Sequence, residues 1–219
     1  PPSLTPLFPS RLVDSELGPI PEGWRVAALD SIADFRNGLA LQRFAPREDE
    51  EPLPVIKIRE LRTGVDASSG LASPSIRPDC IIDDGDVIFS WSGSLMVVIW
   101  CGGRGALNQH LFRASSTRYP RWLYYFWLLE HLPAFQDIAG DKATTMGHIQ
   151  RHHLTEAKVI IPSAALLDAA TGILEPYLER IVHNNVESRT LATTRDALLP
   201  RLLAGKLDLD WAQRSGGDM

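Results

Sequence analysis

Short apolar runs separated by turns fill the middle of the chain. Residues 87–91, 95–100 and 106–114 are rich in β-branched and aromatic side chains, and glycine-containing turns separate them. We expect three consecutive strands in this region. Residues 53–58 form another apolar, β-branched run and predict a further strand.

Two segments of the same region are predicted to be helical. Residues 28–35 place Leu29, Ile32 and Ala33 at helical spacing, and an Asn-Gly pair then supplies a turn or a C-cap. Residues 119–132 carry a proline in the first turn and are apolar nearly all round, which predicts a buried helix. Together these elements predict an α+β domain with a mixed β-sheet, from about residue 24 to residue 162.

The pattern changes after residue 162, because apolar residues then follow an alternating three-then-four spacing. This spacing predicts a coiled-coil-like helical arm over residues 163–204, about 60 Å long at ~1.5 Å per residue. Pro176 and Pro200 predict a kink or a restart within it. The polar middle positions Asn184 and Ser188 suit a register-fixing contact with a second helix. The seam consists of Leu167, Leu174, Tyr177, Ile181, Leu191, Leu198 and Leu202.

The two ends of the chain differ from the middle in composition. Residues 1–23 contain six prolines, which predict an extended arm or inter-domain linker, and we interpret the start as a linker left by truncation. Residues 205–219 are predicted to be a tail. The chain is 44% hydrophobic and 22% charged, and no apolar run approaches the roughly 20 residues of a membrane span. Two cysteines are too few for a disulfide framework and favour a cytoplasmic location.

The net charge of −5 argues against a dedicated DNA-binding domain, which is usually basic. The distribution of the charges weakens this objection, because residues 87–129 contain arginines but no aspartate or glutamate. One face of the domain can therefore be positive.

A polar, basic segment at residues 141–153 is the first candidate for contact with DNA. Its side chains donate hydrogen bonds to phosphates and base edges and include no obvious pair of nucleophile and base. A solvated connection is the alternative. His148, His152 and His153 could hold zinc, but no cysteine or well-spaced carboxylate accompanies them, so we predict no metal. The candidates in this segment are Lys142, Thr144, Thr145, His148, Arg151 and His152.

Other candidates lie in the strand region. Asn108 and Gln109 have side chains that can read adenine, or they can brace the strands. Ser90 and Ser92 share one face of a strand, for phosphate contact or plain exposure. The glycines around Arg104 can form an amide nest for phosphate, although hairpin turns use the same glycines. The full set is Arg36, Lys57, Arg59, Ser90, Ser92, Arg104, Asn108, Gln109 and His110.

Two rival functions remain open at this point. Asp79, Asp83, Asp84 and Asp86 could hold Mg²⁺ in a metal-dependent DNA endonuclease, but no Glu-x-Lys follows on the next strand and the cluster is ordinary turn chemistry. A scaffold that binds only protein through the helical seam is the second rival. We predict no catalytic residues.

Five segments, taken in order over most of the chain, resemble the specificity subunit of type I restriction-modification systems. They are 21–24 (Pro-Glu-Gly-Trp), 85–94 (Gly-Asp-Val-Ile-Phe-Ser-Trp-Ser-Gly-Ser), 108–112 (Asn-Gln-His-Leu-Phe), 144–149 with 159–162, and 191–207. The family's subunit carries two target-recognition domains, each followed by a helical spacer. The chain resembles one such half, and the lead-in at residues 7–18 resembles the junction before the second domain.

The resemblance implies a function without catalysis. The target-recognition domain would read one half of a bipartite double-stranded DNA site, and the helical spacer would dock modification (methyltransferase) subunits and, through them, restriction subunits. S-adenosylmethionine, ATP and Mg²⁺ are expected on those partners, because this chain shows no cofactor-binding glycine loop and no P-loop. An isolated half could also form a homodimer through its helix. The recurrence of residues 108–110 in the family favours a brace or a phosphate contact there over base readout.

Overall fold

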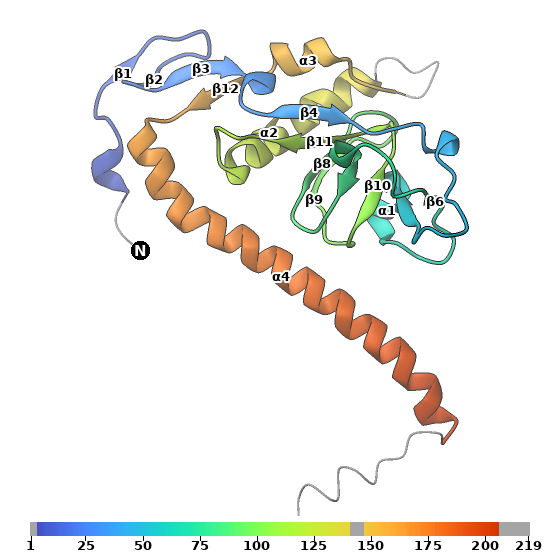
Figure 1. Cartoon of the computed structure of the whole chain (residues 1–219). Helices are drawn as coiled ribbons and strands as arrows, with labels where there is room; N and C mark the ends of the chain where they lie inside the picture. The colour runs from blue at the N-terminus through green and yellow to red at the C-terminus, as the bar shows by residue number, and fades with distance from the viewer. Residues whose placement is uncertain (1–3, 141–146, 206–219) are drawn as a thin grey trace, which may run out of the picture.

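The computed structural model describes residues 4–140 and 147–205. It shows a mixed α+β body and a single long helix, α4 (Ala164–Leu203), that runs beneath the body and projects beyond it (Figure 1). The predicted fold class, an α+β domain followed by a helical arm, is therefore confirmed. In this part of the chain no helix combines the length and the apolar character that a membrane span requires.

The larger sheet is antiparallel and has the order β4-β11-β8-β9. It consists of β4 (Asp34–Asn37), β11 (Leu111–Ser115), β8 (Val87–Ser90) and β9 (Met96–Ile99). One face packs on α2 (Arg121–Gly140), and the side chains between them form the main hydrophobic core. Every residue of β8 is buried, which explains its nearly continuous apolar sequence.

The second sheet is mixed and has the order β6-β5-β10-β7. β5 (Leu53–Ile56) and β10 (Gly105–Leu107) are parallel, whereas β6 (Leu71–Ala72) and β7 (Ile81–Ile82) are antiparallel to their neighbours. A small core of isoleucine and leucine with Trp100 joins this sheet to the larger one. Helix α1 (Ile58–Thr63) follows β5 directly.

A two-stranded ladder closes the domain. β3 (Arg25–Ala28) pairs antiparallel with β12 (Lys158–Ile161), so the first and last strands of the domain lie side by side. Helix α3 (Arg151–Glu156) precedes β12, and the β1–β2 hairpin (Leu12–Val13 with Ile20–Pro21) precedes β3. Four short 3-10 helices connect these elements: η1 (Thr5–Leu7), η2 (Leu29–Ser31), η3 (Leu41–Arg43) and η4 (Pro78–Cys80).

Two predicted elements are wrong, and a third is shorter than predicted. Residues 28–35 are not a helix, because only η2 separates β3 from β4 and the backbone of 34–35 pairs with β11. Residues 106–114 are two strands in different sheets, interrupted where the Asn108 amide donates to the Ile56 carbonyl (3.0 Å). The strand at 53–58 ends at Ile56, because the Glu60 carboxylate accepts the Lys57 amide (3.1 Å) and starts α1.

The prolines of α4 do not interrupt it, contrary to the prediction. Each proline removes one hydrogen bond, to the carbonyl four residues earlier. Pro176 and Gly172 are both exposed, as are Pro200 and Asp196, so the released carbonyls lie at the solvent-facing surface of the helix. The helix begins at the N-cap Ser163, whose Oγ accepts the Leu166 amide (3.4 Å).

Candidate nucleic-acid interface

Five polar or aromatic side chains from distant parts of the sequence converge where the strands of the larger sheet end. The carboxyl ends of β4 and β8 meet the amino end of β11 there, because Asn37 pairs with Phe112 and Ser90 pairs with Leu111. Residues 147–149 run beside residues 91–93, with the Ile149 amide donating to the Trp91 carbonyl (3.0 Å). We call Asn37, Trp91, His110, His148 and Arg151 the strand-end surface.

The half-buried Trp91 ring lies at the centre of the strand-end surface. Its Nε1 donates to Asn37 Oδ1 (3.0 Å), and its ring is 5.7–5.9 Å from those of Phe112 and His110. The His148 ring meets it edge-on at 6.3 Å. These contacts fix the tryptophan in one orientation and leave part of an aromatic face at the surface.

His110 is held on both sides of its ring. Its Nδ1 is 2.9 Å from Ser92 Oγ, and its Nε2 is 3.3 Å from Gln109 Nε2. Because an amide nitrogen only donates, His110 Nε2 is the acceptor in its contact with Gln109. The Asn108 Oδ1 accepts the His110 amide (3.3 Å), which completes the turn between β10 and β11.

Arg151 is exposed at the start of α3 and lies across the strand ends. One Nη2 hydrogen donates to the Phe35 carbonyl (2.7 Å), and the guanidinium sits 5.3 Å from the centre of the Phe112 ring. A guanidinium has five N–H donors, so the Phe35 contact leaves most of them for other acceptors. Together with Asn37, Trp91 and His148, Arg151 lines a shallow cavity of about 300 Å³.

Several predicted DNA contacts lie elsewhere. Ser90 is fully buried and its Oγ donates to the Ser92 carbonyl (3.2 Å), and Ser92 and Asn108 are also buried, so these three side chains brace the surface instead of forming part of it. Arg36 lies on the opposite face of the sheet from Phe35, where it pairs across the strands with Arg113.

Lys57 and Arg59 lie around the start of α1. Lys57 is exposed and follows Ile56, the partner of Leu107, so its backbone lies beside the 108–110 turn. Arg59 is engaged by the carboxylates of Glu60 (2.6 Å) and Asp66 (3.0 Å), which leaves it a structural ion-pair role.

The glycine turn before β10 is not a phosphate nest. Gly103, with φ of 85°, donates its amide to Asp84 Oδ1 (2.7 Å), so a carboxylate of the protein already occupies the position an anion would take. Arg104 is exposed in this turn, at the opposite end of β9 from the strand-end surface. The predicted Lys142, Thr144 and Thr145 lie outside the described residues.

Three of the four predicted carboxylates are engaged by arginines. Asp79, Asp84 and Asp86 each form an ion pair, and Asp86 Oδ2 also accepts the Asp83 amide (2.9 Å) as turn chemistry requires. The prediction that no well-spaced carboxylate accompanies the histidines is wrong, because over residues 4–140 and 147–205 the ligand atoms of His152, His153 and Glu156 lie within 4.8 Å of one another. In this group His153 Nδ1 accepts the Gln150 amide (3.0 Å).

The predicted helical seam divides into two parts. Leu167 and Leu174 are partly buried against the main core, so they hold α4 to its own domain and do not face a partner. Tyr177 and Leu191 are more than 60% exposed. The exposed part of the seam consists of Tyr177, Ile181, Leu191, Leu198 and Leu202.

The sequence patterns did not indicate Trp91 as a member of the site, because it ends a predicted strand. An amphipathic residue at a strand end is the signal that could have identified it.

A small α+β domain that presents polar side chains at its strand ends beside a projecting helix is the general class these observations define. Residues 21–175 match the type I restriction modification DNA specificity domain, and the chain belongs to this family.

Individual relatives agree with this assignment. The chain is 24% identical over 200 residues to the type I restriction enzyme MjaIX specificity subunit of Methanocaldococcus jannaschii, covering 87% of this chain and 46% of that protein. It is 23% identical over 194 residues to the EcoBI specificity subunit of Escherichia coli, covering 86% and 40%. The chain thus spans less than half the length of these relatives.

A solved structure has a similar fold. The S subunit of the type I restriction-modification system from M. genitalium superposes with a TM-score of 0.53 at 14% identity, covering 83% of this chain and 46% of that one. This similarity concerns the fold.

Proposed function

We propose that this chain reads one half of a bipartite double-stranded DNA site for a type I restriction-modification complex. The observation that carries the proposal is the convergence of Asn37, Trp91, His110, His148 and Arg151 at the strand ends of the larger sheet. Family membership supports it, because this domain is the one the relatives share.

The side chains suggest separate tasks within the strand-end surface. Arg151 has donors directed away from the core and suits a phosphate oxygen. The family resemblance favoured a brace at residues 108–110, but Gln109 is only partly buried beside His110, so its amide is available to read an adenine edge. Ser92 and Asn108 then act by orienting His110 and the turn that carries Gln109.

The helical arm supports a second proposal, that the exposed seam of α4 docks methyltransferase subunits and, through them, restriction subunits. S-adenosylmethionine, ATP and Mg²⁺ would then bind to those partners, and this chain would recognise DNA without catalysing a reaction. The same seam can alternatively pair with the helix of a second copy, which would favour a symmetric site. We place this activity in the cytoplasm, where such a complex would meet DNA.

Selection from a randomised duplex pool at two salt concentrations, with and without methyltransferase subunits, tests the DNA proposal. Arg151→Gln should weaken binding to all sequences and reduce the slope of log K against log salt by about 1. Gln109→Ala should instead relax the preference at one base position, at a cost of ~1–3 kcal/mol. Arg104→Gln is the matched control for charge and should change neither.

Two outcomes would contradict the proposal. If Arg104→Gln weakened DNA binding as much as Arg151→Gln, the strand-end surface would be the wrong surface. If the parent protein enriched no sequence in any combination of partners and salt, the scaffold that binds only protein would replace it.

A further inference from the structure

The distal half of α4 is tied to the recognition domain at one corner. The Arg189 guanidinium forms a bidentate ion pair with Asp84, with Nη1–Oδ1 of 2.8 Å and Nη2–Oδ2 of 2.9 Å, and also donates to the Cys101 carbonyl. The Gly103 amide donates to the same Asp84 carboxylate (2.7 Å). Two turns of the domain, around residues 84 and 102, thus meet one side chain of the helix.

The proximal half of α4 is held independently and more extensively. Leu166, Ala170 and Leu178 are buried. The Trp122 indole of α2 donates to Thr171 Oγ1 (2.9 Å). A half-buried ion pair joins Arg121 of α2 to Glu175 of α4 (2.6 Å). Beyond Leu178, no residue of the helix up to Leu203 is buried.

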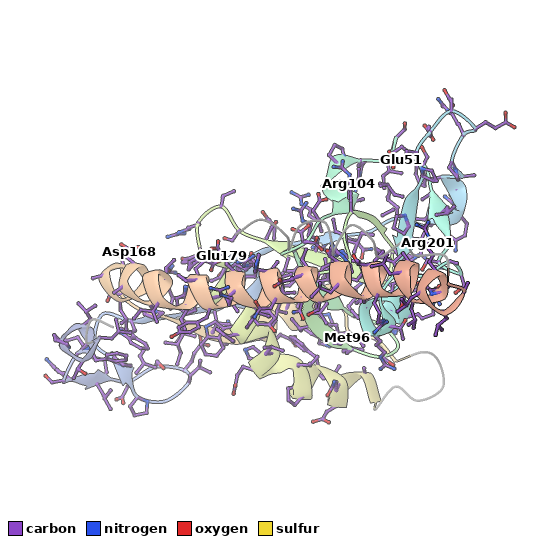
Figure 2. All side chains as sticks on the ribbon, turned by 90° about the horizontal axis from the view of Figure 1, so that it is seen from below. Glu51, Met96, Arg104, Asp168, Glu179 and Arg201 are labelled. Atoms are coloured by element: carbon purple, nitrogen blue, oxygen red, sulfur yellow. The ribbon has the colours of Figure 1, made fainter. Side chains whose placement is uncertain are left out.

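Two attachment points along a rod determine its direction. Arg189 lies 14 residues beyond Glu175, which is about 21 Å along the helix axis at ~1.5 Å per residue. Leu203 lies a further 14 residues on, so the end of the helix is about 42 Å from the first point. Figure 1 shows this distal end projecting away from the body, and Figure 2 labels Asp168 and Arg201 near the two ends of α4.

We propose that the Asp84–Arg189 ion pair fixes the angle between the recognition domain and α4, and thereby the number of base pairs between the two half-sites that the complex reads. The inference rests on the proposed function, because it presupposes a bipartite site. Arg189 is a positioning residue in this scheme, since it contacts Asp84 and Cys101 and lies on the helix, not on the strand-end surface.

The geometry sets the size of the effect. If the second attachment is lost, α4 can pivot about the contacts near Glu175. A tilt of about 10° displaces the far end of a ~42 Å lever by about 7 Å, which corresponds to roughly two base pairs at ~3.4 Å each. A small angular freedom is therefore sufficient to admit neighbouring spacings.

The test compares Arg189→Met with Arg201→Met. Arg201 is exposed on the same helix, and its side chain forms no hydrogen bond or ion pair among the residues described, so its replacement removes the same charge without touching the domain. The complex of the full chain with its methyltransferase subunits is presented with duplexes that carry both half-sites at gaps varied one base pair at a time. The parent and Arg201→Met should select one gap, whereas Arg189→Met should accept gaps one or two base pairs away.

A second readout follows the angle without DNA. Spin labels carried by a non-natural amino acid at the exposed Glu51 and Arg201 report the distance between the body and the end of the helix (Figure 2). Arg189→Met should broaden that distance distribution by several ångström, and the swapped pair Asp84→Arg with Arg189→Asp should narrow it again.

The outcomes separate the two proposals. A parent complex with a fixed gap and an Arg189→Met complex with the same single gap would overturn the inference and leave the proposed function intact. An unchanged label distance in Arg189→Met would also overturn it. A parent complex with no preferred gap would overturn the proposed function and the spacing role together.

Discussion

Gly38→Ala should be strongly destabilising, because two backbone segments cross at this residue. A Cβ at Gly38 would lie 2.6 Å from the Asn108 carbonyl carbon and closer still to the carbonyl oxygens of Leu107 and Asn108. Since ordinary contact begins at 3.4 Å, the segments must separate by at least ~0.8 Å, and by more at the two oxygens. Neither is a flexible side chain, so the backbone itself has to move.

The displacement breaks hydrogen bonds that position the 108–110 turn. The Leu39 amide donates to Leu107 and the Gln109 amide donates to Leu39, both at 2.9 Å. An extra ~0.8 Å takes both outside hydrogen-bonding range, at about 1 kcal/mol each. With a further ~1 kcal/mol of overpacking strain, the total loss is about 3 kcal/mol.

Urea unfolding followed by tryptophan fluorescence measures this loss. With an m-value of about 2 kcal/mol/M, the midpoint should fall by about 1.5 M. Gly172→Ala is the matched control, because no atom lies within 4 Å of a Cβ there and alanine favours the helix, so the midpoint should stay or rise. A Gly38→Ala midpoint equal to that of the parent would refute the argument from the backbone crossing.

Three further predictions concern other parts of the molecule. Leu198→Asp, on the exposed seam of α4, should abolish co-purification with methyltransferase subunits while leaving the thermal midpoint unchanged; retained assembly would show that Leu198 is not in the interface. Leu128→Ala should lower the free energy of unfolding by ~2–5 kcal/mol in urea titrations, because Leu128 is fully buried in the main core; a loss below 1 kcal/mol would contradict this. The hydrogen bonds from Arg189 lower the pKa of Asp84 in the folded protein, so the ion pair stabilises the helix attachment above the ordinary aspartate pKa and is lost as the pH falls through the lowered value. The distance between labels at Glu51 and Arg201 should therefore broaden on acidification in the parent and already be broad at neutral pH in Asp84→Asn.

Local patterns in the sequence predicted much of the fold. Residues 87–90 and 96–99 are strands and 121–140 is a helix, because these apolar runs are long enough to dominate their surroundings. Residues 28–35 are an exception with a specific physical reason. Leu29, Ile32 and Ala33 are all buried as a helix would require, but a 3-10 turn between two strands buries the same three positions.

The interruption at 108–110 depends on a contact that the local sequence does not contain. The Asn108 amide donates a hydrogen bond to the carbonyl of Ile56, which lies 52 residues earlier in the sequence. The membership of the candidate site likewise depends on contacts between residues that are distant in the sequence. Ser90 and Asn108 have side chains suited to DNA contact, but both are buried. Trp91 has the sequence context of an ordinary strand residue, and only the fold brings Asn37 and His148 beside it.

The ladder between β3 and β12 has a consequence for how such domains are exchanged. Because Arg25 faces Ile161 across the ladder, the chain enters and leaves the domain at neighbouring positions. A genetic replacement of everything between these two residues has to match one pair of adjacent junctions and the face of α2 that packs on the proximal half of α4, whose exposed seam is left unchanged. Under the proposed function, a new DNA specificity would arrive in this way as a whole module, provided that the incoming domain places an acid at the position of Asp84.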